Sequence, residues 1–237
     1  MNEEYESIYL LGDLHGKWNV ILNSIDRYGC ENGYIIQVGD FGVGFAASHR
    51  EEEELFPISE ALLDNGLELL VIRGNHDDPE LFDGRSPLPG ITYLEDYTVR
   101  NLNGKNFLFV GGAVSLDRVH RIPYIDYWFD ELVRGQPVEQ WKPDQETIDV
   151  VVTHTAPQVA PPELRITSPI VQAHAKEDSG LIKAIMNENE KMDILYDQVM
   201  SLGNPSHWYY GHFHESHTTY VGETKFVMLD INEMAML

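Results

Sequence analysis

Residues 7–16 read SIYLLGDLHG, an apolar run that ends in the segment Gly12-Asp13-Leu14-His15-Gly16. The apolar run predicts a buried strand over residues 7–11, and the segment places a carboxylate and an imidazole directly past its end. Gly accounts for about 7% of residues in average proteins and Asp and His are rarer, so this segment should arise by chance at fewer than roughly one in 10^5 positions. We therefore interpret it as a functional motif at a strand end.

The same arrangement recurs along nearly the whole chain. Apolar runs predicted as strands over residues 34–38, 67–72, 149–153 and 207–210 lead into Gly39-Asp40, Gly74-Asn75-His76-Asp77, Thr153-His154 and Gly211-His212-Phe213-His214. In an open α/β sheet, ligands collect in the crevice beyond the carboxyl ends of the strands. We therefore expect these motifs to meet in one cleft.

Helical and hairpin patterns fill the intervals between these strands. One helical face carries Trp18, Ile21, Leu22 and Ile25. Further helices are predicted around residues 56–64 and over residues 179–202, with 187–190 as the point where the second could break. Asn103-Gly104 and Gly222-Glu223 predict hairpins joining 98–102 to 107–110 and 218–221 to 225–229, whereas 112–144 has no regular pattern. The order predicts an α/β fold with parallel and antiparallel strands, in one domain spanning residues 1–237.

The composition is strongly acidic, with a formal net charge of −23 and a pI near 4.6. Such a surface repels phosphate backbones and anionic lipid, so nucleic acid is disfavoured as a partner. Dissolved salt screens the repulsion between charges more than about 8 Å apart, so a single phosphate group can still bind as a ligand. Cys30 is the only cysteine, which excludes a disulfide framework. The first residues lack a signal-peptide pattern and no apolar run reaches roughly 18 residues, so we expect a cytoplasmic protein without membrane association. The oligomeric state stays open.

The strand ends supply seven oxygen and nitrogen donors: Asp13, His15, Asp40, Asn75, His154, His212 and His214. One ion with an open coordination position does not need seven, whereas two ions about 3.5 to 4 Å apart that share a carboxylate would use them. Asp40 is the expected bridge, because it is a lone carboxylate on a Gly-flanked turn. Donors without sulfur suit Mn, Fe, Zn or Co. We expect a glycine before each motif to permit a sharp turn: Gly12, Gly39, Gly74 and Gly211.

In type and order, the five motifs resemble those of the calcineurin-like metallophosphoesterase superfamily, over residues 13–214. The resemblance implies a four-layer α/β/β/α sandwich of two mixed sheets and two divalent metal ions, with Mn2+ expected and Fe, Zn, Co or Ni as alternatives. It implies one ion held by Asp13, His15, Asp40 and His214, and a second held by Asp40, Asn75, His154 and His212. It also implies attack on a phosphate ester by a metal-activated hydroxide. His76 would protonate the leaving-group oxygen or stabilise the equatorial phosphoryl oxygens.

Val43 separates the chain from two subclasses of this superfamily. Protein Ser/Thr phosphatases carry Asp-Arg-Gly from this position and purple acid phosphatases place a metal-bound Tyr there, whereas this chain has Val43-Gly44-Phe45. The terminal Gly-His-x-His motif is more similar to the phosphodiesterase-type and broad-specificity branches. We therefore expect a small phosphorylated substrate, either a monoester or a diester. Two alternatives stay open: a phosphomonoesterase like the protein Ser/Thr phosphatases, and a non-catalytic metal-binding scaffold of the same fold.

Without Asp-Arg-Gly, another cation must meet the phosphate. Arg118 and Arg121 follow a predicted strand and a small-residue segment, and Arg73 precedes Gly74; these three are the candidate substrate-binding residues. Each has a structural alternative, such as a salt bridge from Arg118 to Asp117 or Asp126. The nearby aromatic cluster could stack on a base, form a cap or pack: Tyr124, Tyr127, Trp128 and Phe129. We expect Asp77 and Asp78 to cap a short helix that begins at Pro79.

Overall fold

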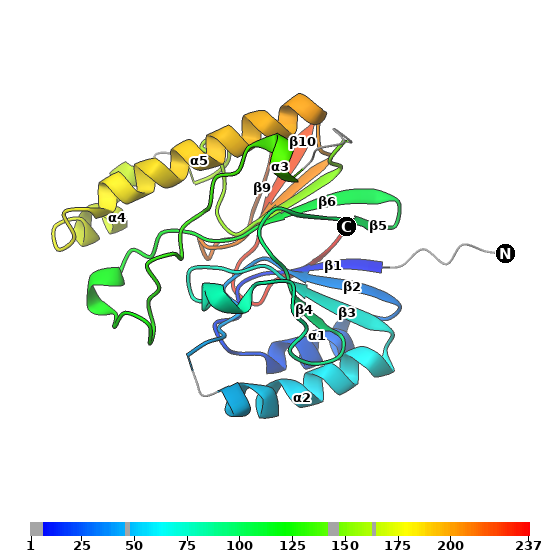
Figure 1. Ribbon diagram of the computed structural model, residues 1–237. Coiled ribbons are helices and arrows are strands. Elements are labelled where there is room, and N and C mark those ends of the chain that lie inside the picture. Colours follow the sequence, from blue (N-terminus) through cyan, green and yellow to red (C-terminus); the bar gives the residue numbers. More distant parts are fainter. Residues whose placement is uncertain (1–6, 46–47, 142–146, 163–164) are drawn as a thin grey trace.

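The computed structural model describes residues 7–45, 48–141, 147–162 and 165–237, which form two stacked β-sheets between layers of helices (Figure 1). The first sheet has the strand order β11-β1-β2-β3-β4. Its strands are β1 (Ser7–Leu11), β2 (Gly33–Gln37), β3 (Leu67–Val71), β4 (Ile91–Tyr93) and β11 (Met234–Met236). The strands β1 to β4 run parallel and β11 pairs with β1 in the antiparallel direction, so the sheet is mixed.

The second sheet has the order β5-β6-β7-β8-β10-β9. Its strands are β5 (Thr98–Leu102), β6 (Lys105–Val110), β7 (Val150–Thr153), β8 (His207–Tyr210), β9 (His217–Val221) and β10 (Thr224–Met228). The central strands β6, β7, β8 and β10 are parallel, and β5 and β9 are antiparallel at the edges. Both predicted hairpins are present. The first turns on Asn103 and Gly104 with φ of 52° and 75°, as a type I′ turn requires.

Both sheets are buried on two faces because successive side chains of a strand point in opposite directions. Leu10 of β1 shares the core between the sheets with Phe107 of β6, whereas Leu11 belongs to the core on the outer face of the first sheet. Three helices form the outer layers: α1 (Asn19–Tyr28) and α2 (Ser48–Asp64) on the first sheet, and α5 (Leu181–Leu202) on the second (Figure 1). These layers confirm the predicted α/β/β/α sandwich.

Several elements differ from the sequence prediction. The prediction missed β4, β11 and the helix α4 (Pro169–His174), all of them short. The helix predicted around residues 56–64 is α2, which begins at Ser48 and includes the acidic residues 51–54. The helix α5 does not break near residue 188. Glu188 is buried and accepts hydrogen bonds from the Val114 backbone N–H and the Thr155 hydroxyl, so its polarity reflects a buried contact rather than a helix end.

The segment predicted to be irregular contains two short elements, η2 (Arg118–His120) and α3 (Val138–Trp141). Two other single turns are η1 (Pro79–Leu81) and η3 (Arg165–Thr167). No helix in the described ranges is long and apolar enough to cross a membrane.

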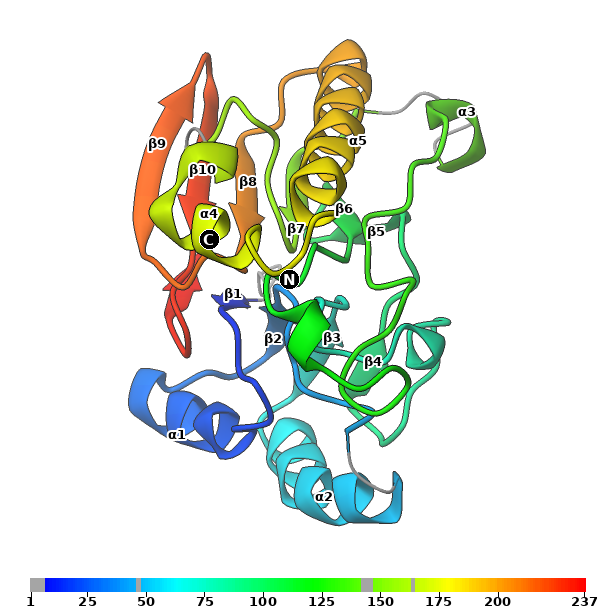
Figure 2. The ribbon, with the colours of Figure 1, turned by 90° about the vertical axis from the view of Figure 1, so that its left-hand side faces the viewer.

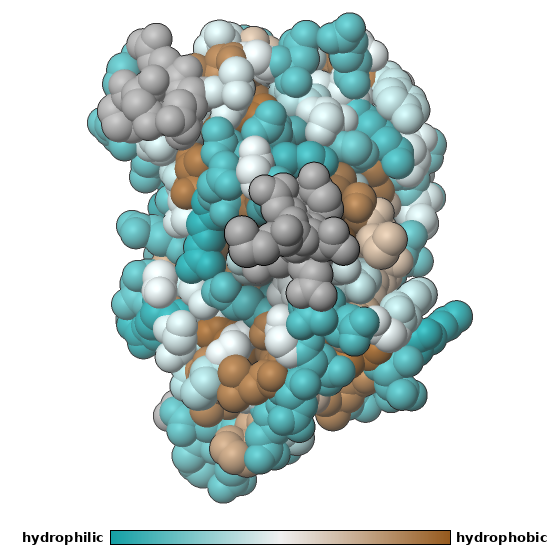
Figure 3. Space-filling model, turned by 90° about the vertical axis from the view of Figure 1, so that its right-hand side faces the viewer, coloured by the Kyte–Doolittle hydropathy of each residue, from teal (hydrophilic) through white to brown (hydrophobic). Residues whose placement is uncertain are grey.

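The segments that follow β1, β2, β3, β7 and β8 carry the five motifs, and they lie together at the end of the sandwich that faces the viewer in Figure 2. The loop between β6 and α3 and the helix α4 lie in front of this end. The opposite end is mainly hydrophilic, with hydrophobic side chains gathered in its lower part (Figure 3). The sandwich thus brings together residues that are far apart in the sequence, such as His15 and His214, which are 199 positions apart.

Candidate metal centre

Four of the predicted ligands form a first donor set at the ends of β1, β2 and β8. Asp13, His15, Asp40 and His214 each offer one donor atom within 4.8 Å of the others. The Nε2 atoms of His15 and His214 lie 3.0 Å apart, and His214 Nε2 is 3.3 Å from Asp13 Oδ2. Two imidazole nitrogens at this distance need a proton or a cation between them. The set therefore has the chemistry of a cation site.

A second donor set lies beside the first. Asp40, His154 and His212 also have donor atoms within 4.8 Å of one another. His154 Nε2 is 3.2 Å from Asp40 Oδ1 and 3.2 Å from Asn75 Oδ1, which adds the predicted amide ligand to the set. His154 Nδ1 lies 2.8 Å from the Val38 carbonyl oxygen. Because Nδ1–H donates to that carbonyl, Nε2 is aimed at the donors, as in metal-binding histidines.

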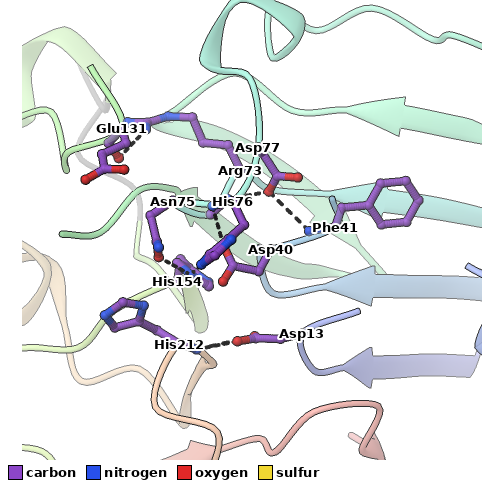
Figure 4. Close-up of polar contacts among 12 residues, drawn as sticks. Asp13, Asp40, Phe41, Arg73, Asn75, His76, Asp77, Glu131, His154 and His212 are labelled. Carbon is purple, nitrogen blue, oxygen red and sulfur yellow. Dashed lines mark hydrogen bonds and ion pairs between the residues drawn. The ribbon is translucent and has the colours of Figure 1, made fainter. Parts of the chain in front are cut away.

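Asp40 belongs to both donor sets. Figure 4 shows it beside His154 of the second set. Its Oδ2 lies 3.7 Å from His15 Nε2, while its Oδ1 lies 3.2 Å from His154 Nε2. Its Oδ1 also accepts a hydrogen bond of 2.8 Å from the His76 backbone N–H, and the residue is only 1% exposed. The carboxylate is thus fixed between the two sets, at the position expected of a bridge.

The backbone at four of these residues is in the left-handed region, which residues other than Gly rarely adopt. The φ angles are 47° at His15, 55° at Asp40, 67° at His212 and 53° at His214. Such conformations cost of order 1–3 kcal/mol each and cluster at functional sites. Their concentration at the predicted ligands supports a functional role for the two donor sets.

Two glycines act by close approach, contrary to the sharp turn expected from the sequence. A Cβ on Gly74 would lie 2.0 Å from Asp40 Oδ1, and one on Gly211 would lie 2.1 Å from Asp13 Oδ1. Neither glycine has a positive φ; among the four expected turn glycines only Gly39 does, at 100°. The missing side chains at 74 and 211 therefore make room for the carboxylates themselves.

The electrostatics of the site favour a positive charge between the donors. Burial raises the pKa of Asp13. Burial acts in the same direction on Asp40, but the neighbouring imidazoles, first of all His154, lower the pKa of Asp40 well below its usual range. Burial opposes the charged form of His154, yet Asp40 raises the pKa of His154 to about 9. A proton on His154 therefore neutralises Asp40 here, and a bound cation would meet the same need.

His76 lies next to the donor sets without belonging to either. Its ring meets the ring of His15 edge to face at 4.8 Å, and its Nε2 lies 2.7 Å from Nη2 of Arg121. Nη2 of Arg121 is also 2.7 Å from Asp117 Oδ1. Burial lowers the pKa of His76 to about 4, and Arg121 adds to this effect against the opposing charge of Asp40. His76 is thus a neutral imidazole that accepts a hydrogen bond from Arg121.

Of the three candidate substrate-binding arginines, the structure brings only Arg121 to the site. Arg73 is 1% exposed and donates to the Asp96 carboxylate through Nε and Nη2 and to three backbone carbonyls, so all its donor capacity is used for the fold. Arg118 pairs with Asp178 at 2.5 Å rather than with Asp117 or Asp126, and it faces a separate groove along α5. These contacts support the structural alternative for Arg73 and Arg118, and substrate binding by either residue stays a prediction.

The aromatic cluster divides between packing and exposure. Trp128 is buried and meets Phe45 edge to face at 5.0 Å, and Phe45 stacks on His76. Tyr124 and Phe129 are exposed and contact each other. None of the four predicted residues lines the cavity at the donor sets. Packing is therefore the role that the structure supports for Trp128.

Asp77 has a role that the sequence prediction missed. It is fully buried and its carboxylate accepts backbone N–H bonds from Phe41, Gly42, Val43 and Gly74, at 2.6–3.2 Å. Figure 4 shows the bond from Phe41. Only Asp78 caps η1, by accepting from the Glu80 N–H. Asp77 therefore ties the Asp40 loop to the Asn75 loop. The motif contained the signal, an acidic residue two positions after a ligand, but its partners lie in another loop.

A cavity of about 660 Å³ opens onto both donor sets. One wall carries the donors together with His76 and Arg121. The facing wall is mainly apolar and comes from the loop after β6 and from α4 and α5: Val114, Leu116, Ile170, Val171 and Ile185. Arg165 also lines it, with its guanidinium 4.7 Å from the ring of Phe213. The cavity is large enough for a phosphoryl group with an organic substituent.

Comparison with known proteins accounts for the ordered motifs. A family model described as calcineurin-like phosphoesterase matches residues 7–216, which include both donor sets. The chain belongs to this family. No curated protein sequence matches the chain.

Solved structures similar to this calcineurin-like phosphoesterase include three at low identity. Phosphopantetheinyl hydrolase from Mycobacterium tuberculosis is 15% identical, with 96% of this chain and 90% of that chain covered and a TM-score of 0.47. An archaeal phosphodiesterase is 13% identical, with 98% of each chain covered and a TM-score of 0.41. A predicted phosphoesterase from Streptococcus pneumoniae is 13% identical, with 95% and 72% covered and a TM-score of 0.36.

Proposed function

We propose that this protein is a dinuclear-metal-dependent phosphoesterase that hydrolyses a small phosphate monoester or diester. The observation that carries the proposal is the position of Asp40, whose two carboxylate oxygens face two separate donor sets. Membership of the calcineurin-like phosphoesterase family supports the same reaction class. One metal ion would not require both sets, whereas a pair sharing Asp40 uses all of them.

The donor chemistry fits two divalent ions. Asp13, His15, Asp40 and His214 would hold one ion, and Asp40, Asn75, His154 and His212 would hold the other. Oxygen and imidazole donors without sulfur suit Mn2+, which we take as the first candidate, and also Fe, Zn, Co and Ni. When bound, such ions supply Lewis acidity toward the phosphoryl oxygens and lower the pKa of the attacking water.

His76 and Arg121 are the groups of this chain that would act on the phosphoryl group. Both line the cavity, and they contact each other at 2.7 Å. An arginine suits a phosphoryl oxygen because its guanidinium matches the geometry of the anion. When Arg121 turns to the phosphoryl group, His76 Nε2 is free to take up a proton from solvent, which the negative charge of the substrate favours. It would then donate this proton to the leaving-group oxygen as the acid.

The facing wall of the cavity indicates where the organic part of the substrate lies. With the phosphoryl group at the donor sets, the substituent extends toward Leu116, Ile170 and Val171, which offer apolar contact. A small molecule fills such a space, whereas the acidic surface disfavours a long phosphate backbone. We therefore propose a small phosphorylated molecule with an apolar portion as the substrate.

Hydrolysis of p-nitrophenyl phosphate and of bis(p-nitrophenyl) phosphate, each with added Mn2+, tests the proposal. We expect turnover that is lost on chelation, restored by Mn2+ and abolished by Asp40→Asn. The matched control is Asp64→Asn, which removes an exposed carboxylate at the carboxyl end of α2, away from the donor sets, and should leave turnover unchanged. A wild-type protein that holds two ions but hydrolyses neither ester nor any member of a phosphorylated-metabolite panel would overturn the proposal.

A further inference from the structure

The orientation of the Asn75 side-chain amide determines whether its oxygen or its nitrogen faces the second donor set. Its Oδ1 can bind a cation, whereas its Nδ2 carries two hydrogens and repels one, so the side chain serves the second donor set in only one of its two orientations. Oδ1 faces His154 Nε2 at 3.2 Å and Nδ2 faces Ser115 Oγ at 2.9 Å. The hydrogen-bond partners of Ser115 therefore decide which end of the amide the metal centre receives.

Ser115 has its partners fixed by a buried carboxylate. Its Oγ lies 2.7 Å from Glu131 Oε2 and its backbone N–H donates to Glu131 Oε1 at 2.9 Å. Asn75, Ser115 and Glu131 are 3%, 1% and 0% exposed, so these bonds do not compete with bulk solvent. An ionised carboxylate only accepts hydrogen bonds, so the single Ser115 hydroxyl hydrogen is directed to Glu131. Toward Asn75 the hydroxyl oxygen can then only accept.

Arg73 holds Glu131 in this position. Its Nη1 donates to the Glu131 carbonyl oxygen at 2.8 Å (Figure 4). Its Nη2 donates to the Leu132 carbonyl oxygen at 2.9 Å. Arg73 stands two residues before Asn75, at the end of β3, whereas Glu131 comes from the loop after β6. The same short segment thus presents the ligand and anchors the residue that orients it.

We infer that Glu131 and Ser115 are positioning residues that fix the Asn75 amide with its oxygen toward the second donor set. The direction of donation runs from Asn75 Nδ2 to Ser115 Oγ and from Ser115 Oγ to Glu131 Oε2. The inference rests on the metal site in the proposed function. It concerns binding of the second ion, which is measured separately from turnover.

The variant Glu131→Gln tests this inference because it reverses the relay with little change in volume. The Ser115 N–H needs an acceptor, so the oxygen of the introduced amide takes the Oε1 position and its NH2 group donates to Ser115 Oγ. The hydroxyl hydrogen then points at Asn75 and favours the flipped amide. At about pH 8 we expect affinity for the second Mn2+, measured by calorimetry and metal analysis, to fall by about 10–100-fold, while the first ion is retained.

The background Asn75→Asp provides the matched control. An Asp side chain accepts at both ends, so it can accept the reversed hydroxyl and still offer an oxygen to the donors. In that background, adding Glu131→Gln should change the affinity for the second Mn2+ by no more than about twofold. A change of this size is the deviation expected between two substitutions that do not interact. Should Glu131→Gln fail to fold, Ser115→Ala removes the same relay, and it should weaken the second ion in the wild-type background but not in Asn75→Asp.

Two results would overturn the inference. One is a Glu131→Gln protein that is folded by circular dichroism and binds both ions with wild-type affinity. The other is an equal loss of the second ion in the wild-type and Asn75→Asp backgrounds, since the effect would then not pass through the direction of an amide. A wild-type protein that binds two Mn2+ ions without turnover contradicts the proposed function alone.

Discussion

Arg73→Gln separates the structural role of Arg73 from the substrate-binding role that the sequence predicted. The guanidinium and its partner Asp96 are 1% and 4% exposed, and Arg73 Nη2 lies 2.7 Å from Asp96 Oδ2. Two further bonds go to the carbonyl oxygens of Glu131 and Leu132, at 2.8 and 2.9 Å. Gln keeps an amide donor but loses the charge and the reach to these partners. The variant therefore leaves a buried carboxylate without its cation.

The expected loss follows from the burial of this pair. Removing one partner of a buried ion pair costs about 3–5 kcal/mol of unfolding free energy. For a chain of this length each 1 kcal/mol corresponds to roughly 2–4 °C, so the Tm should fall by about 6–20 °C. Urea denaturation of the chelated protein, followed by tryptophan fluorescence, measures the loss without a contribution from bound metal.

Arg134→Gln is the matched control for this measurement. Its partner is Asp130, which lies four positions earlier and at 3.0 Å, and the two side chains are 45% and 56% exposed. An exposed pair of this kind contributes only about 0.2–1 kcal/mol. Equal stability losses in the two variants would refute the structural assignment of Arg73. So would an Arg73→Gln protein of wild-type stability in which inorganic phosphate inhibits turnover more weakly.

Other changes have expected results that rest on the same contacts. His76→Asn should lower kcat by about 10²–10⁴-fold at unchanged Mn2+ content, as measured by steady-state kinetics and metal analysis, because His76 stands outside both donor sets; loss of metal would contradict this. Gly211→Ala, whose Cβ would lie 2.1 Å from Asp13 Oδ1, should weaken Mn2+ binding in calorimetry while the far-ultraviolet circular dichroism is retained. Burial raises the pKa of Glu131 from 4.5 to about 7, so the folded chain holds an extra proton between these values and stability falls as pH rises through them. Glu131→Gln should remove up to about 3 kcal/mol of that fall in urea titrations of the chelated protein; an unchanged pH slope would contradict it.

The strands and the position of the motifs were predictable because burial on both faces leaves a local signature. The run from Ile8 to Leu11 is apolar at successive positions, which requires cores above and below the sheet. Parallel strands place their carboxyl ends at one edge, so Asp13, Asp40 and Asn75 had to approach one another. By contrast, β4 and β11 have three residues each, which is too short for a local pattern to reveal a strand.

The choice among the arginines and acids depended on the tertiary structure. Arg118 and Arg121 stand in the same segment, yet Asp178, which is 60 positions away, withdraws Arg118 from the site. Asp77 and Glu131 were not predicted as supporting residues, since Asp77 binds another loop and Glu131 binds a serine 16 positions away. Thus the sequence by itself determined which strand ends carry the donors, because hydrophobic periodicity is local. Only the folded chain decided which charged side chains face the cavity, because ion pairs and directed hydrogen bonds depend on partners distant in sequence.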